Sequence, residues 1–139
     1  VTGIETSDAM IEQSLYREKV IKSDVFVGNY DVVLMNWTLH FIKSKWTYVD
    51  KIYDSMNAGG VLILTDKVKQ SAAVKEMYYD FKRDNGVTDA YIYEKENKLK
   101  GYMHLYPIEW YLETFSKVGF KNVQIINSRL GFVTFYMEK

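Results

Sequence analysis

Two nearly continuous apolar runs flank an amphipathic segment in the first half of the chain. The runs Asp31–Met35 and Val61–Leu64 predict strands that are buried on both faces. Between them, apolar residues recur at helical spacing and predict a helix over Lys45–Met56. A strand, a helix and a second strand in this order predict a βαβ unit with a right-handed crossover.

The segment NAGGVLILTDK, Asn57 to Lys67, connects that helix to the second strand. Gly59 and Gly60 are predicted to end the helix, because glycine adopts left-handed backbone geometry at little cost. The strand that follows ends abruptly in polar and charged residues. Open α/β sheets bind ligands at the carboxyl ends of their strands, so polar residues there form a candidate ligand site. The polar residues predicted at these ends are Glu5, Thr6, Asp24, Asn36 and Asp66.

The remaining elements extend this pattern into one α/β domain over residues 1–139. Further strands are predicted over Val1–Glu5, Val20–Phe26, Lys121–Asn127 and Gly131–Met137, and further helices over Ala9–Glu18, Ala72–Asn85 and Ile108–Val118. The short segment NSRL (127–130) joins the last two strands, which predicts an antiparallel hairpin. Thr88–Lys100 is charged and rich in tyrosine, and a loop or lid is predicted there. The fold class expected is an open, mostly parallel α/β sheet with helices on both faces.

Composition narrows the functional classes only slightly. Eighteen basic residues balance eighteen acidic ones, so the overall charge does not indicate a polyanion partner. The chain has no cysteine, which excludes a disulfide framework and a thiolate metal site, and we expect a cytoplasmic protein. Its longest apolar run is too short to span a membrane, and no membrane association is predicted. The two histidines, His40 and His104, lack ligand spacing, so no metal site is predicted and a structural or surface role is favoured.

Several basic residues and tyrosines follow the second buried strand. Contact with RNA phosphates would explain them, but the charged outer faces of helices are the commoner explanation and the one favoured here. The basic residues are Lys67, Lys69, Lys75, Lys82 and Arg83. Tyr78, Tyr79 and Tyr91 are candidates to line a substrate, although Tyr78 also fits a buried helical stripe.

Specific motifs connect this pattern to a known family. The segments NWTLHF (36–41), KIYDSMNAGGVLILTDK (51–67) and DFKRDNG (80–86), together with IETSDAMIE (4–12), resemble class I S-adenosylmethionine-dependent methyltransferases. Within that superfamily, the chain is most similar to the carboxy-S-adenosylmethionine synthases of tRNA wobble-uridine modification. NAGG alone is common in the superfamily, whereas DFKRDNG together with NWTLHF is more specific. The resemblance covers nearly the whole chain but only about the last two-thirds of such a protein.

The resemblance implies a Rossmann-like fold, S-adenosylmethionine as cofactor, and a role for five residues. Glu5, with Thr6 beside it, matches the acid that accepts hydrogen bonds from the ribose hydroxyls, a role that suits an acceptor-only carboxylate. Asp24 and Val25 match the pair that holds the adenine. Asn36 matches a residue beside the sulfonium. No catalytic residue is predicted, because methyl transfer depends mainly on positioning.

The chain departs from the family pattern at its N-terminal end. The glycine-rich loop that lets the backbone approach the cofactor is absent, since VTGIETSD contains a single glycine. In the favoured register, Val1 begins at the family's second strand, and the central first strand is missing. The chain is then a fragment, or another segment or subunit fills the slot, for example in a homo-oligomer. In an alternative register, VTGIETSD is the first strand and Val20–Asp24 the second.

A second departure concerns the acidic residue Glu96. Counting without gaps from DFKRDNG places Glu96 where the synthases have the arginine that holds the carboxyl group of their cofactor. Two carboxylates about 4 Å apart would repel by about 4 kcal/mol at an effective dielectric constant of about 20. Ordinary S-adenosylmethionine is therefore favoured over its carboxylated form.

Three functional hypotheses follow. The first is a methyltransferase-like protein that transfers a one-carbon group from S-adenosylmethionine to an unknown small-molecule acceptor. The second is a carboxy-S-adenosylmethionine synthase, for which any involvement of tRNA is indirect. The third is a non-catalytic remnant that assembles with a partner supplying the missing strand.

Overall fold

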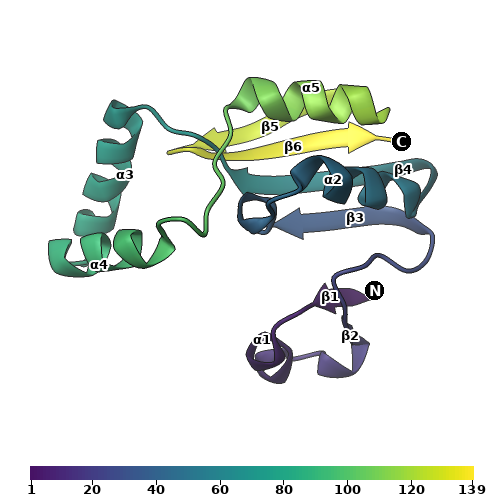
Figure 1. Ribbon diagram of the computed structural model, residues 1–139, viewed down its shortest axis with the longest axis horizontal. Coiled ribbons are helices and arrows are strands. Elements are labelled where there is room, and N and C mark those ends of the chain that lie inside the picture. Colours follow the sequence, from purple (N-terminus) through teal and green to yellow (C-terminus); the bar gives the residue numbers. More distant parts are fainter.

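The six strands form two separate sheets in the computed structural model, which describes residues 1–139 (Figure 1). The smaller sheet pairs β1 (Gly3–Glu5) with β2 (Val20–Lys22) in parallel. The larger sheet has the order β3 (Tyr30–Asn36), β4 (Met56–Lys67), β6 (Phe132–Glu138) and β5 (Lys121–Arg129). β3 and β4 are parallel, whereas β6 is antiparallel to both its neighbours. The open α/β class is confirmed, with parallel pairing in two of the four strand pairs.

Five helices join these strands. They are α1 (Asp8–Gln13), α2 (Lys45–Asp54), α3 (Ala72–Asp84), α4 (Asp89–Leu99) and α5 (Ile108–Val118), with short 3-10 turns at Arg17–Lys19 and Leu39–Phe41. In Figure 1, α3 and α4 form an arm that extends away from the four-stranded sheet, and β1, β2 and α1 form a separate N-terminal lobe (residues 1–29).

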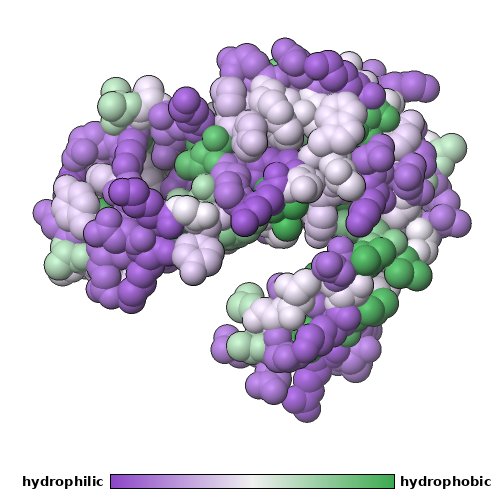
Figure 2. All heavy atoms as spheres, viewed as in Figure 1, coloured by the Kyte–Doolittle hydropathy of each residue, from purple (hydrophilic) through white to green (hydrophobic).

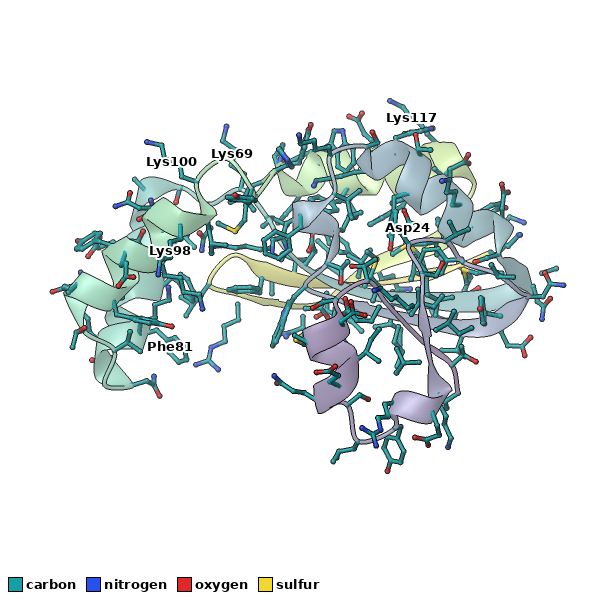
Figure 3. The ribbon with its side chains drawn as sticks, turned by 60° about the horizontal axis from the view of Figure 1, so that its bottom comes forward. Asp24, Lys69, Phe81, Lys98, Lys100 and Lys117 are labelled. Atoms are coloured by element: carbon teal, nitrogen blue, oxygen red, sulfur yellow. The ribbon has the colours of Figure 1, made fainter.

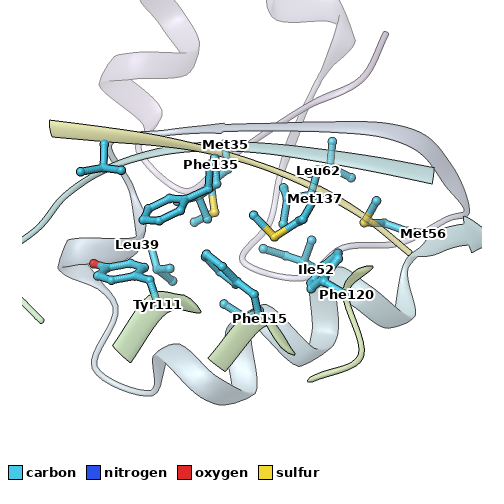
Figure 4. Close-up of a cluster of buried hydrophobic side chains, with 14 of the residues drawn as sticks. Met35, Leu39, Ile52, Met56, Leu62, Tyr111, Phe115, Phe120, Phe135 and Met137 are labelled. Atoms are coloured by element: carbon cyan, nitrogen blue, oxygen red, sulfur yellow. The ribbon is translucent and has the colours of Figure 1, made fainter. Parts of the chain in front are cut away.

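The hydrophobic core lies between the four-stranded sheet and helices α2 and α5 (Figure 4). Every second residue of β4 and β6 points into it, as the burial of Leu62, Leu64 and Phe135 shows. The ring of Tyr111 on α5 stacks on Phe135 with centroids 5.5 Å apart, and this packing fixes α5 across the sheet. Residues from α1, α3 and α4 take no part in this core.

The opposite face of β3 is open, contrary to the prediction that helices cover both faces. Val32 and Leu34 point away from the core and are 59% and 67% exposed. The run DVVLM predicted burial on both sides because it contains no polar residue between its apolar ones. In the structure only Val33 and Met35 are buried.

The double glycine is inside strand β4, and the prediction that it ends the preceding helix was wrong. Helix α2 already ends at Asp54, and β4 begins at Met56. Strands β3 and β4 pair with a shift in register here, since Tyr30 pairs with Met56 and Val32 pairs with Val61. Gly60 lies in this irregular region, where the backbone of β3 approaches closely.

The predicted loop over Thr88–Lys100 is helix α4 instead. Thr88 caps the helix by accepting a hydrogen bond from the backbone N–H of Tyr91, and Asp89 occupies its first turn. Ile92 is its only buried residue, so the sequence lacks the apolar stripe that marks most helices.

Helix α1 is also shorter than predicted, and two apolar residues of its predicted range are at the surface. The helix ends at Gln13 rather than Glu18, and Met10 and Leu15 are exposed. In α3, Met77 and Phe81 are likewise exposed, and the buried residue is Tyr79. These two helices pack on small elements rather than on the main core, so their apolar residues do not predict burial.

The C-terminal hairpin is confirmed, with a tighter turn than predicted. Strands β5 and β6 are joined by Leu130 and Gly131, whose φ angles are 50° and 81°. Positive φ at both positions is the geometry of a type I′ turn, whose twist matches that of the strands.

An unfilled position separates the two sheets. β1 pairs only with β2, and β3 pairs only with β4, so each keeps one free edge. The two strands point in the same direction (Figure 1), and residues from both line one cavity. The cavity therefore lies between two strands that each have a free edge.

Candidate functional site

A cavity of about 350 Å³ lies between β1 and β3. In the space-filling view an open notch lies between the N-terminal lobe and the arm of α3 and α4, and the lobe meets the rest of the molecule on one side only (Figure 2). Glu5 at the end of β1 and Asn36 at the end of β3 both line this cavity, although they are 31 positions apart in sequence. The carboxyl ends of two parallel strands thus bring together two of the predicted site residues.

Glu5 presents one free carboxylate oxygen. Its Oε1 accepts hydrogen bonds from the backbone N–H groups of Thr6 and Ser7, at 2.7 and 2.9 Å. These bonds fix the carboxylate at the point where β1 turns into α1. Its Oε2 makes no hydrogen bond within the chain and remains available to accept one from a ligand hydroxyl.

Asn36 is followed by a residue in a strained backbone conformation. Trp37 has a φ of 52°, in the left-handed region that a bulky side chain rarely adopts. Its backbone N–H donates to the carbonyl of Thr65 at 2.8 Å, so the turn is held by the neighbouring strand. The Asn36 side chain itself is exposed and makes no hydrogen bond. Strained residues of this kind cluster at binding and catalytic sites.

The other three predicted residues do not line the cavity. Thr6 lies just past the end of β1, and its backbone N–H donates a hydrogen bond to Oε1 of Glu5. Asp24 and Val25 are exposed in the segment between β2 and β3, where Asp24 is labelled in Figure 3. The charge of Asp24 nevertheless reaches the cavity, because it acts together with Glu5 on Tyr48.

Two aromatic residues that the sequence did not single out line the cavity. Phe26 and Tyr48 pack edge to face with ring centroids 5.4 Å apart, and both border the space between the strands. Burial, and then the nearby charges of Asp24 and Glu5, raise the pKa of the Tyr48 hydroxyl above its usual value. The hydroxyl therefore stays protonated and can donate a hydrogen bond.

Asp66, which the sequence placed on the ligand rim, is buried in a polar network instead. Its Oδ1 lies 2.6 Å from His40 Nδ1 and accepts a second bond from the His40 backbone N–H at 3.1 Å. The hydroxyl of Tyr111 donates to Oδ2 at 2.7 Å. Burial and the charge of Asp66 raise the pKa of Tyr111 well above its ordinary value. His40 thus has the structural role that its sequence context favoured, and Asp66 contributes to stability rather than to binding.

Lys45 is the positive member of this buried region. Its ammonium donates to the carbonyls of Leu39 and Ile42 at 2.6 and 2.8 Å, which fixes the turn between β3 and α2. Burial lowers the pKa of Lys45 to about 8, against an opposing effect from the charge of Asp66. Lys45 thereby closes the turn that follows Asn36–Thr38 and helps to fix the position of these three residues.

We expect the stability of the protein to rise with pH in a window set by Lys45. The folded protein releases the Lys45 proton near pH 8, whereas the unfolded chain keeps it until about pH 10.5, so the unfolded state binds more protons between these values. The free energy of unfolding should rise by about 3 kcal/mol across this window. Urea unfolding at a series of pH values measures it. The variant Lys45→Met should lose this rise; an equal rise in both proteins would contradict the assignment.

The structure shows neither a metal-binding cluster nor a membrane-spanning helix. No three His, Asp or Glu side chains are grouped so that they could hold a metal ion. Each helix is too short or too polar to cross a lipid bilayer.

Several solved structures with a similar arrangement are methyltransferases. A methyltransferase dependent on S-adenosylmethionine from Thermotoga maritima aligns with 99% of this chain and 72% of its own, with a TM-score of 0.66 and 19% identity. Another from Archaeoglobus fulgidus aligns with 99% of this chain and 75% of its own, with a TM-score of 0.67 and 11% identity. The fold is therefore that of the class I methyltransferases.

Curated sequences similar to this chain are carboxy-S-adenosyl-L-methionine synthases. That of Aliivibrio salmonicida is 28% identical over 144 aligned positions, which cover 90% of this chain and 60% of the relative. That of Escherichia coli O1:K1 is 29% identical and is covered over 58% of its length. The chain thus spans about three-fifths of the length of these relatives. No protein-family model matches it.

Proposed function

We propose that this chain, with its class I methyltransferase fold, binds S-adenosylmethionine and transfers a one-carbon group from it to a small-molecule acceptor. The observation that carries the proposal is the convergence of Glu5 and Asn36 on one cavity at the carboxyl ends of β1 and β3. The curated relatives, which are synthases of a carboxylated S-adenosylmethionine, support the same cofactor class.

The residues present suit the nucleoside half of the cofactor. The free oxygen of Glu5 can accept a hydrogen bond from a ribose hydroxyl. Phe26 and Tyr48 offer an aromatic wall for a flat base, and Asp24 lies close enough to influence Tyr48. Within this proposal Asp24 and Val25 hold the adenine, with Thr6 supporting Glu5. The lining of the cavity contains no glycine-rich turn that could hold the methionine half of the cofactor.

The chemistry needs little from the protein beyond positioning. When bound, the sulfonium of S-adenosylmethionine supplies an already electrophilic carbon. The Asn36–Thr38 rim, held by the left-handed Trp37 and the turn that Lys45 closes, would orient the acceptor toward it. The alternative activity, synthesis of carboxy-S-adenosylmethionine for tRNA wobble-uridine modification in the cytoplasm, is supported by the curated relatives. Against it, the gapless count places Glu96 rather than an arginine at the expected position, and Glu96 is bonded to Lys75 and Tyr79 and does not line the cavity between β1 and β3.

Isothermal titration calorimetry with S-adenosylmethionine tests the proposal. Glu5→Gln should weaken binding by about 10- to 100-fold, because a hydrogen bond to a charged acceptor contributes roughly 1.5 to 3 kcal/mol. Glu12→Gln, an exposed change on α1 outside the cavity, should leave affinity unchanged. Equal affinity in wild type and Glu5→Gln would remove Glu5 from the site. Tighter binding of the carboxylated cofactor would favour the synthase.

The open position between the sheets supports a second hypothesis. An additional parallel strand, from a second copy or from another segment, would pair the free edges of β1 and β3. In a non-catalytic assembly module, this pairing would be the function itself. A folded dimer, identified by light scattering, that binds no S-adenosylmethionine would establish this hypothesis over the first.

A further inference from the structure

A second cavity, of about 340 Å³, lies between α3, α4 and the end of β4 and carries a strong local positive charge. Its only carboxylate is Glu96, so five lysines leave a surplus of four positive charges in a chain whose net charge is zero. The lysines are Lys67, Lys69, Lys75, Lys82 and Lys95. Figure 3 shows Lys69 beside the arm formed by α3 and α4.

Two of these ammonium groups lie over the same aromatic ring. Lys82 Nζ is 4.3 Å and Lys67 Nζ is 5.2 Å from the centroid of Tyr78. Neither ammonium lies within 4 Å of a carboxylate oxygen, since neither takes part in a salt bridge. Burial and then the charge of Lys82 lower the pKa of Lys67, and burial and then Lys95 lower the pKa of Lys82. The cavity thus holds like charges close together, with Glu96 as the one carboxylate that lines it.

Glu96 opposes the lowered pKa of both lysines but forms no hydrogen bond or salt bridge with either. One of its oxygens bonds to Lys75, and the other accepts from the hydroxyl of Tyr79. By contrast, Arg83 on the outer side of α3 is paired with Glu76, Asp80 and Asp89. The interpretation of these basic residues as an ordinary outer helix face therefore holds for Arg83 but not for Lys67 and Lys82.

The lining of the cavity also includes apolar side chains. They are the buried Ile92, together with Leu99, Met103 and Leu105, and the exposed ring of Tyr91 lines the cavity as well. A flat ring could pack against these side chains while a charged group contacted the lysines.

We propose that this cavity binds a nucleotide, with its phosphate between Lys67, Lys82 and Lys95 and its base against Tyr91 and the aliphatic side chains. Lysine ammonium groups act as point charges toward phosphate, and several of them match an anion with more than one negative charge. An aromatic ring beside a basic groove is how proteins hold a base next to its phosphate. The nucleotide can be free or part of a single-stranded RNA. This site is separate from the cavity between β1 and β3 and does not depend on the function proposed for it.

Calorimetry with adenosine 5′-diphosphate, inorganic pyrophosphate and a six-nucleotide single-stranded RNA tests the site without S-adenosylmethionine. Adenosine 5′-diphosphate should bind the wild type, and Lys67→Gln/Lys82→Gln should weaken this binding at least tenfold. Lys121→Gln, an exposed lysine on β5 outside this cavity, should have no effect. Thermal unfolding should show the double variant to be as stable as the wild type or more stable, because the change removes repulsion between the two ammonium groups.

Two outcomes would overturn the proposal: no binding of any of these probes to the folded wild type, or equal affinity in the double variant. Pyrophosphate binding as tightly as adenosine 5′-diphosphate would also overturn it, because the base would then contribute nothing. If the RNA binds more than tenfold more tightly than adenosine 5′-diphosphate, the ligand is an RNA strand. If the two bind alike, it is a free nucleotide.

Discussion

Replacing Asp66 with alanine is expected to lower the free energy of unfolding by about 4 kcal/mol, since removing one partner of a buried charged network costs about 3 to 5 kcal/mol. Asp66 is completely buried and accepts bonds from the His40 ring, the His40 backbone and the Tyr111 hydroxyl. Without the carboxylate, these donors stay buried without an acceptor, and the charge of Lys45 loses its counterpart.

Urea unfolding followed by circular dichroism measures this loss. Asp66→Asn keeps an acceptor of the same shape and should cost less than Asp66→Ala. Asp50→Ala, an exposed position on α2 without a salt bridge, should change stability by no more than about 0.5 kcal/mol. A loss below about 1 kcal/mol in Asp66→Ala would show that the network contributes little.

Gly60→Ala is expected to destabilise the protein by about 3 kcal/mol, as overpacking of a well-packed site does. A Cβ atom at this position would lie 2.9 Å from the Asn57 carbonyl oxygen, 3.1 Å from that of Tyr30 and 3.2 Å from that of Asp31. All three are backbone atoms, so relief requires β3 and β4 to move apart at the point where β3 begins.

Gly59→Ala provides the matched comparison. A Cβ atom there meets nothing within 4 Å, but the φ of 77° is unfavourable for alanine. The expected loss is about 1 to 2 kcal/mol, from backbone strain alone. Thermal or urea unfolding of both variants separates the two effects. An equal loss in the two variants would mean that the close approach of the strands does not determine the need for Gly60.

Local signals predicted some elements well and missed others for physical reasons. Helix α5 begins and ends as predicted, at Ile108 and Val118, because Pro107 and Gly119 mark its ends and an apolar stripe runs between them. Helix α4 was missed because its signal is a cap at Thr88, without an apolar stripe. The role of Gly60 depends on carbonyl groups of β3 that are distant in sequence, so no local pattern could reveal it.

The candidate site was predictable only in part. Parallel strand ends placed Glu5 and Asn36 on a common edge, and the structure brings them to one cavity. The same reasoning placed Asp66 there, and this was wrong, because it bonds to His40 and Tyr111, which are 26 and 45 positions away. Phe26 and Tyr48 carried no signal that distinguishes a cavity wall from an ordinary core aromatic residue. The basic residues and tyrosines of the second cavity could be recognised in the sequence, but their grouping around one cavity could not be predicted from it.

The two outer strands of the four-stranded sheet differ in their protection against self-association. β5 carries Lys121 and Arg129, and its pairing with β6 is interrupted twice, features that discourage a foreign strand from docking. β3 has a charged residue and a register shift only at its start, at Asp31, and along the rest of the strand Val32 and Leu34 are exposed. In a concentrated solution of this chain, we therefore expect aggregation to start at β3. A strand that paired with the free edge of β3 would also keep the protein soluble.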